Sequence, residues 1–177
     1  MAIKMPSQEE SRRASAQLEA EGQVDRYTQM IKAGQDENYA IWYNLGVAYT
    51  NLEEWDNALE AYEKAVDLEP QMAQAWVNMA AVKYRTGHLA EAEELNRKAL
   101  EITPDFMHAR SNLGMVLLLL GKYDESIEEM NKVLEQEPKH PVALAALTQA
   151  YNAKGDTEKG AEFKKKAEEA GIKFEDK

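Results

Sequence analysis

The chain contains no cysteine. Disulfides, thiolate metal sites, iron–sulfur clusters and a cysteine nucleophile are therefore excluded together. Glycine and proline are also scarce, at 9 and 5 of 177 residues, while apolar residues make up 44% of the chain. This composition favours a packed core over disorder. The longest strongly apolar run, residues 115–120, is far shorter than the roughly 20 residues of a membrane-spanning helix.

Basic residues are outnumbered by acidic ones, and the formal net charge is −11. Phosphate groups of nucleic acids and anionic membrane surfaces repel such a protein, so we expect no nucleic-acid partner and no membrane insertion. Residues 1–20 mix charges throughout and lack the apolar stretch of a secretory signal. We therefore expect a cytoplasmic protein.

A repeat of 34 residues runs through most of the chain. Four residues mark one register of it: Trp42, Trp76, Arg110 and Leu144. Three prolines near the ends of the copies keep the same spacing: Pro70, Pro104 and Pro138. The copies are residues 39–72, 73–106, 107–140 and 141–174. Self-similarity at such a period is typical of proteins built from stacked structural repeats.

Each copy predicts two helices joined by a turn. The first helix carries apolar side chains at helical spacing, as in Trp42, Leu45 and Tyr49. Small residues at the eighth and twentieth positions allow the two helices to cross closely. At the eighth position they include Gly46, Ala80 and Gly114, at the twentieth Ala58 and Ala92, and alanine recurs at the twenty-seventh as Ala65 and Ala99.

The segment from Trp42 to Tyr49, followed by Ala58, Ala65 and Pro70, resembles the tetratricopeptide repeat signature. The resemblance is strong over residues 39–140 and weaker over residues 141–174. It implies an all-α fold, a right-handed superhelical solenoid of antiparallel helix pairs. It also implies a scaffold or adaptor that binds other proteins and is not an enzyme.

The two ends of the array depart from the pattern. Residues 8–33 predict two helices joined near Gly22, with an apolar stripe that includes Leu18, and we interpret residues 7–38 as a degenerate N-terminal repeat. The last helix of the fourth copy, residues 157–170, is rich in lysine and glutamate, as a capping helix should be. We expect residues 1–6 to be disordered and residues 175–177 to form a short tail.

No residue pattern indicates catalysis, a metal or a cofactor. The three histidines, His88, His108 and His140, lack a second histidine or a carboxylate at metal-ligand spacing on the same helix face. The chain also lacks a phosphate-binding glycine loop and a nucleophile–base pattern. We therefore expect no cofactor and no metal.

The resemblance implies that the first helices line a concave groove for an extended peptide. Asn44, Asn78 and Asn112 share the sixth position of their copies and would form a ladder of amides that bonds peptide backbone, unless each bonds only locally. The other groove candidates carry little charge, and they are Tyr43, Val47, Val77, Tyr84, Arg85, His108, Met115, Leu118 and Leu119. Leu118 and Leu119 either form an anchor pocket for a partner or pack against the first helix of the fourth copy.

One groove chemistry known in the family can be compared residue by residue. Repeats that hold the acidic C-termini of heat-shock chaperones use lysine, arginine and asparagine at fixed positions to clamp two carboxylates. The equivalent positions here are Tyr43, Val47, Asn78, His108 and Asn112, of which only Asn78 matches. We expect no chaperone-tail binding by that mechanism.

Two alternatives to the groove adaptor remain open. The chain could be a self-assembling scaffold, through contacts between repeats or through an N-terminal segment in which Ile3 and Met5 act as a plug. It could also be a dedicated assembly or secretion chaperone. Charge is uneven along the array, because the first copy has seven acidic residues against Lys64 alone. A basic partner would be attracted to that end at low salt, unless the acidic residues form only a solvated face.

Overall fold

The computed structural model describes residues 7–173, which form helices joined by short turns and contain no β-strand. The chain divides into two compact units, unit 1 up to Val82 and unit 2 from Lys83. In chain order the elements of residues 7–173 are α1 (Gln8–Met30), the π-helix η1 (Ile31–Gln35), α2 (Tyr39–Asn51), α3 (Trp55–Leu68), α4 (Ala73–Arg85), α5 (Leu89–Ile102), α6 (Met107–Leu119), α7 (Tyr123–Gln136), α8 (Pro141–Ala153) and α9 (Thr157–Glu169).

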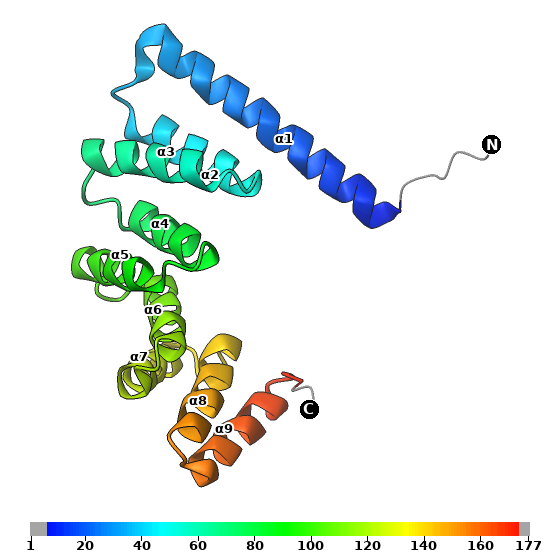
Figure 1. The fold of residues 1–177 in the computed structure, drawn as a ribbon, viewed down its shortest axis with the longest axis vertical. Helices are drawn as coiled ribbons and strands as arrows, with labels where there is room; N and C mark the ends of the chain where they lie inside the picture. The colour runs from blue at the N-terminus through cyan, green and yellow to red at the C-terminus, as the bar shows by residue number, and fades with distance from the viewer. Residues whose placement is uncertain (1–6, 174–177) are drawn as a thin grey trace, which may run out of the picture. The chain divides into compact units, whose positions relative to one another are not determined.

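The helices come in pairs with the period of the sequence. Helices α2, α4, α6 and α8 begin at Tyr39, Ala73, Met107 and Pro141, and each of these starts lies 34 residues after the last. Within unit 1, α2 packs on α3, and within unit 2, α6 packs on α7 and α8 on α9 (Figure 1). The all-α class of paired helices is therefore confirmed.

The turn inside each pair needs one residue in the left-handed backbone conformation. The glycines supply it in three pairs, with φ of +82° at Gly87, +74° at Gly121 and +83° at Gly155. In the first pair the residue is Glu53, whose φ is +58°. Glycine adopts this conformation without a steric penalty, whereas a side chain with Cβ does not. The first pair is therefore strained at a position where the others are not.

Close helix crossing in unit 1 depends on Gly46 of α2. A Cβ atom at this position would lie 2.6 Å from Cδ1 of Tyr62 on α3, so any side chain would push the two helices apart. In unit 2, a Cβ atom at Gly114 of α6 would lie 2.8 Å from Cε of Met130 on α7. The hydroxyl of Ser126 donates to the carbonyl of Gly114 at 2.7 Å across the same crossing. The small residues thus set the distance between paired helices.

The expectation of two helices joined near Gly22 is wrong. Helix α1 continues through Gly22, where nothing lies close enough to demand a turn, and a single glycine inside a helix costs only about 1 kcal/mol. The chain reverses at Gly34 instead, with φ of +86°. Residues 7–38 therefore supply one long helix and a short π-helix, not a helical pair. Residues 1–6, with Ile3 and Met5, and residues 174–177 lie outside the described part of the chain.

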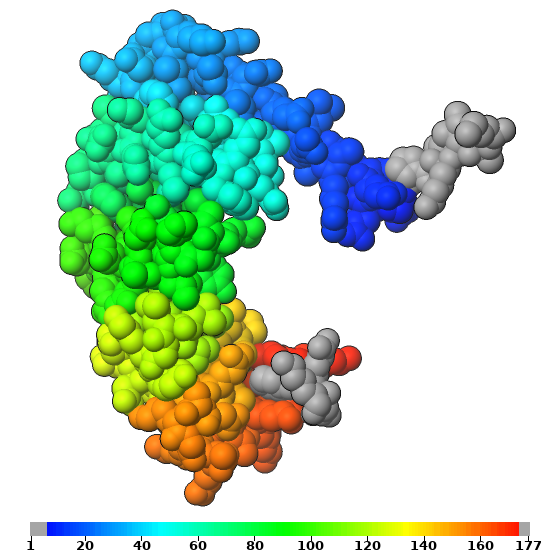
Figure 2. Space-filling view, in the orientation of Figure 1, coloured from blue at the N-terminus to red at the C-terminus, as the bar shows by residue number. Residues whose placement is uncertain are grey.

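The apolar stripe expected along residues 8–33 is also only partly buried. Ala20 is fully buried, but Leu18 is 70% exposed. In Figures 1 and 2 the part of α1 that begins at Gln8 extends away from α2 and α3. Only the second half of α1 thus contributes to the core of unit 1.

Candidate functional site

The first helices of unit 1 present three of the expected groove residues at the surface. Tyr43, Asn44 and Val47 of α2 are half-buried, so part of each side chain is accessible to a partner. Val77 of α4 is different, because it is only 4% exposed. The expectation that Val77 faces a partner is therefore wrong, since the side chain belongs to the core.

Asn78 is engaged in hydrogen bonds within unit 1. Its Oδ1 accepts from Nε2 of Gln74 at 2.9 Å. Its Nδ2 donates to the hydroxyl of Tyr43 at 3.3 Å and to the hydroxyl of Tyr62 at 3.4 Å. Burial raises the pKa of Tyr62, so its hydroxyl stays protonated. Of the two readings of Asn78 open at the sequence level, local bonding is the one observed in the free protein.

Asn44 and Asn112 differ from Asn78. Both are half-buried, and among the residues that the structure describes neither side-chain amide has a hydrogen-bond partner. Their donors and acceptors are available to a ligand, as the ladder hypothesis requires of each rung. Asn44 lies in unit 1 and Asn112 in unit 2, so each is considered with the helices of its own unit.

The pair Leu118 and Leu119 in unit 2 separates into a core residue and a surface residue. Leu118 is 7% exposed and belongs to a core cluster with residues of α7 and of α8, including Ala146 and Leu147. Leu119 is 52% exposed. The alternative in which Leu118 packs on the first helix of the fourth copy is the one observed, and only Leu119 is left as a contact for a partner.

The remaining groove candidates of unit 2 vary in exposure. Met115 is half-buried and packs against the core cluster of Leu118. His108 is exposed, and its ring contacts that of Phe106 edge-on with 6.0 Å between centroids. Tyr84 is 40% exposed and Arg85 is also exposed. These residues leave a surface on unit 2 that is richer in apolar groups than in charge.

The residues of the repeat signature occupy the interior or the helix ends. The alanines of the signature are all fully buried: Ala58, Ala65, Ala80, Ala92 and Ala99. The prolines follow the ends of second helices within two residues: Pro70, Pro104 and Pro138. Leu45 is buried, while Trp42 and Tyr49 are half-buried. These residues build the fold and leave ligand contact to the first-helix surfaces.

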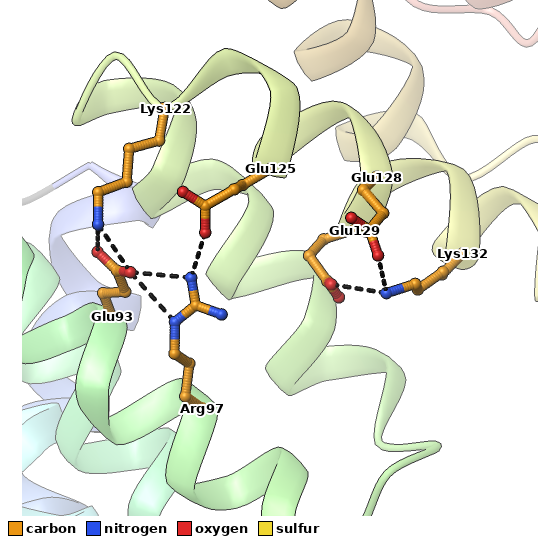
Figure 3. A network of polar contacts seen from close by, with 7 residues as sticks. All are labelled: Glu93, Arg97, Lys122, Glu125, Glu128, Glu129 and Lys132. Carbon is orange, nitrogen blue, oxygen red and sulfur yellow. Dashed lines mark hydrogen bonds and ion pairs between the residues drawn. The ribbon is translucent and has the colours of Figure 1, made fainter.

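A charged network on the second helices of unit 2 was not predicted from the sequence (Figure 3). Glu93 of α5 accepts from Nζ of Lys122 at 2.8 Å and from Nη2 of Arg97 at 2.9 Å, and Arg97 also pairs with Glu125 of α7 at 2.6 Å. Burial alone would raise the pKa of Glu93, but the hydrogen bonds from Lys122 and Arg97 lower it overall. The Glu93–Arg97 spacing is visible in the sequence. The contact with Lys122, 29 residues away, is not.

A second part of Figure 3 joins Glu128, Glu129 and Lys132 of α7. Nζ of Lys132 lies 2.7 Å from an oxygen of Glu128 and 2.9 Å from one of Glu129. These two hydrogen bonds raise the pKa of Lys132. Glu129 also pairs with Arg110 of α6 at 2.6 Å, and both of these side chains are only 13% exposed. The network ties helices together and offers no unpaired carboxylate for acid–base chemistry.

Two further searches of the described residues bear on function. Within residues 7–173, His, Asp and Glu side chains nowhere gather in a group of three or more that could hold a metal ion. No helix in the same range combines the length and the apolar character needed to cross a membrane.

Antiparallel helix pairs that recur every 34 residues, with a small residue at each crossing, define a helical-repeat protein. Tetratricopeptide repeat models match residues 39–72, 73–103 and 108–140, which together make up more than half of the chain. The chain belongs to the tetratricopeptide repeat family.

The relatives show the same repeat in proteins of different names. Photosystem I assembly protein Ycf3 from Rippkaea orientalis (strain PCC 8801 / RF-1) is 33% identical over 72 residues, which are 40% of this chain and 42% of that protein. The chain spans less than half the length of the curated relatives that it matches.

Two solved structures share the fold. A crystal structure of MamA superposes with a TM-score of 0.82 at 23% identity and covers 96% of both chains. The first repeat domain of Spaghetti (RPAP3) bound to the HSP90 peptide SRMEEVD superposes with a TM-score of 0.64 at 25% identity, over 66% of this chain and 93% of that chain. Family and fold together identify a protein-interaction module of a kind that is generally non-catalytic.

Proposed function

We propose that this protein is a non-catalytic scaffold or adaptor that binds an extended segment of a partner protein on the exposed surfaces of its first helices. The observation that carries the proposal is the accessible amide of Asn44, which has no hydrogen-bond partner among the described residues and lies beside the half-buried Tyr43 and Val47 of α2. An amide can donate to and accept from a peptide backbone at once. Asn112 of α6 offers the same group on unit 2.

The relative that carries a peptide supports this mode of binding, but the chemistry differs from a clamp for acidic tails. Lysine and asparagine, which the clamp requires, are replaced by Tyr43 and Val47. Asn78, the one matching residue, is bonded to Gln74, Tyr43 and Tyr62. A pair of ligand carboxylates would therefore lack its cations on unit 1, and we propose an uncharged or backbone-directed ligand instead.

The test is an affinity selection of extended peptides from a display library, followed by titration of the selected peptides. The double variant Asn44→Ala with Asn112→Ala should bind each peptide that it contacts more weakly by about 1 kcal/mol for each lost hydrogen bond. Helicity and melting temperature should stay close to wild type, because neither amide is bonded within the described chain. Gln136→Ala, an exposed residue of the second helix α7, is the matched control. Equal binding by the double variant and wild type would refute the proposal.

Self-association is a second candidate function, and the exposure of Leu18 favours it. A leucine that is 70% exposed on α1, on a helix whose first half extends away from the rest of unit 1, is the kind of apolar contact that a second copy can cover. Sedimentation at increasing concentration should then show dimers or larger species, and Leu18→Glu should return them to monomers. A wild-type chain that stays monomeric at millimolar concentration would exclude this function.

A role as an assembly chaperone is a third candidate, supported by the relative named as a photosystem I assembly protein. Such a protein binds its client transiently and is absent from the mature complex. Pulse labelling of a client complex in the native host would distinguish this role, because a scaffold would remain in the final assembly and a chaperone would leave it.

A further inference from the structure

Hydrogen bonds among polar side chains of unit 1 have a fixed direction. Thr50 donates its hydroxyl proton to the backbone carbonyl of Gly46 at 2.8 Å. A hydroxyl has one proton, so in its contact with the hydroxyl of Tyr62 at 3.0 Å Thr50 is the acceptor. Tyr62 is thus the donor of this bond, and its proton is fully committed inside the protein.

The direction of the remaining bonds follows from Asn78. Its Nδ2 has two protons, and they point to the hydroxyl oxygens of Tyr62 and Tyr43, which both accept. Its Oδ1 accepts from Gln74. Tyr43 therefore accepts one bond from Asn78 but gives none, and its own hydroxyl proton has no acceptor among the described residues. Tyr43 is half-buried, so this proton is available to a ligand on the surface of α2.

The surroundings of Tyr43 indicate the kind of acceptor. Helix α2 contains no Asp, Glu, Lys or Arg, and neither does the part of α4 from Ala73 to Val82. A ligand carboxylate on this surface would lose water without gaining a cation, which is unfavourable. A neutral carbonyl oxygen has no such cost and matches the single free donor.

We infer that the hydroxyl of Tyr43 donates to a main-chain carbonyl oxygen of an uncharged, extended peptide segment, and that Asn78 is a positioning residue that holds Tyr43 in the donating orientation. The ligand contact rests on the proposed function. The direction of the hydrogen bonds is a property of the free protein and is tested without a ligand.

The first experiment is side-chain amide NMR on the free, full chain. Tyr43→Phe removes the acceptor of one Asn78 amide proton, so one of the two Nδ2 proton resonances should move upfield and exchange faster with water. Tyr62→Phe should affect the other resonance. If Tyr43→Phe changes neither proton, the amide has its oxygen toward the tyrosines, the Tyr43 proton is already committed, and the inference is overturned even if peptides bind.

The second experiment measures binding of a defined probe, the tightest member of an array of N-acetylated, C-amidated heptapeptides that contain no charged residue. Tyr43→Phe should weaken binding roughly fivefold to tenfold, which corresponds to one hydrogen bond. Tyr39→Phe, which alters another exposed tyrosine of α2, is the matched control and should leave binding unchanged. Unchanged binding by Tyr43→Phe would overturn the inference while leaving the proposed function standing.

Asn78→Asp tests the positioning role, because a carboxylate of the same shape accepts hydrogen bonds and donates none. The substituted side chain should accept the Tyr43 proton and so reverse that bond. The binding loss should equal that of Tyr43→Phe, should persist at high salt, and should not increase in the double variant. Additive losses, or losses that disappear as salt is raised, would mean that the new charge repels the peptide and that Asn78 does not position Tyr43.

Discussion

The guanidinium group of Arg110 donates a hydrogen bond from Nη2 to the backbone carbonyl of Pro104. Two tryptophans at the equivalent position make the same bond to the residue six positions earlier: Nε1 of Trp42 donates to Asp36 at 2.7 Å and Nε1 of Trp76 to Pro70 at 3.0 Å. Arginine thus replaces the indole donor and adds a charge, which Glu129 neutralises. In the fourth copy Leu144 has no donor and is fully buried instead.

Replacing Arg110 should separate these two roles. Arg110→Ala removes the bond to Pro104 and leaves the poorly exposed Glu129 with only Lys132 as a partner, so we expect a loss of about 2–3 kcal/mol in the free energy of unfolding. Arg110→Trp restores the carbonyl bond and should lose less. Urea denaturation of the full chain measures both, and equal losses would show that the carbonyl bond has no energetic role.

Glu53→Gly should stabilise the protein. Glu53 has a φ of +58° in the turn between α2 and α3, a conformation that costs a residue with Cβ about 1 kcal/mol or more. The substitution should therefore raise the free energy of unfolding by about 1 kcal/mol, despite the greater freedom of glycine in the unfolded chain. Thermal melting monitored by circular dichroism reports the change. Gly121→Ala, the reverse change at φ +74°, should destabilise; opposite signs for the pair are required.

The two crossing glycines should respond differently to alanine. At Gly46 the new Cβ would meet the ring of Tyr62, which is rigid and held by hydrogen bonds, so we expect Gly46→Ala to cost about 1–3 kcal/mol. At Gly114 it would meet the end of Met130, a flexible side chain that can move. The better helix propensity of alanine, about 1 kcal/mol, should then make Gly114→Ala nearly neutral.

A larger residue at Gly114 provides the control for that comparison. Gly114→Leu cannot be accommodated by a shift of Met130 alone and should lower the melting temperature clearly. Chemical denaturation of the three variants side by side gives the order, and a Gly114→Leu variant as stable as wild type would contradict the packing of α6 on α7.

Acid should remove the stabilisation that Glu93 provides. Hydrogen bonds from Lys122 and Arg97 hold the folded-state pKa of Glu93 below its ordinary value of 4.5. A lowered folded pKa means that the contribution is complete above the unfolded pKa and is lost as the pH falls through the folded one. At pH 7, Glu93→Gln should cost about 1–2 kcal/mol, a modest figure because both cations are partly exposed and screened by solvent.

The measurement is urea unfolding of wild type and Glu93→Gln at pH 7 and at pH 3. The difference between the two proteins should shrink at the lower pH, since protonated Glu93 no longer attracts Lys122 and Arg97. A difference that is the same at both values would mean that packing, not charge, accounts for the effect. Glu135→Gln, an exposed acid of α7, should show little effect at either pH.

The periodic part of the fold could be predicted because its determinants repeat in the sequence. Glycine at position 121 fits only a left-handed turn, proline at 104 ends a helix, and the spacing of Leu45 and Tyr49 defines a helical face. The N-terminal segment carries no such redundancy. There Gly22 resembled a break, yet a long helix tolerated it, while the reversal at Gly34 depends on how the chain meets α2.

The candidate site was predicted in outline and corrected in its particulars. Sequence position identified Asn44, Asn78 and Asn112 as equivalent, but their surroundings differ: Asn78 faces two tyrosine hydroxyls, and the other two amides face none among the described residues. Adjacent residues also diverged, because Leu118 is buried by α8 while Leu119 remains exposed. Such differences arise from residues on neighbouring helices, which the local sequence does not contain.

The sequence by itself determined the class of fold, the length of the repeat and the helical pairs, because hydrophobic periodicity and turn residues act over a few neighbours along the chain. Only the tertiary structure decided which polar groups are already bonded, which apolar groups are covered, and that Glu93 meets Lys122 29 residues away. Burial and hydrogen bonding depend on atoms brought together by folding, and their outcome is what separates a structural asparagine from one that can hold a partner.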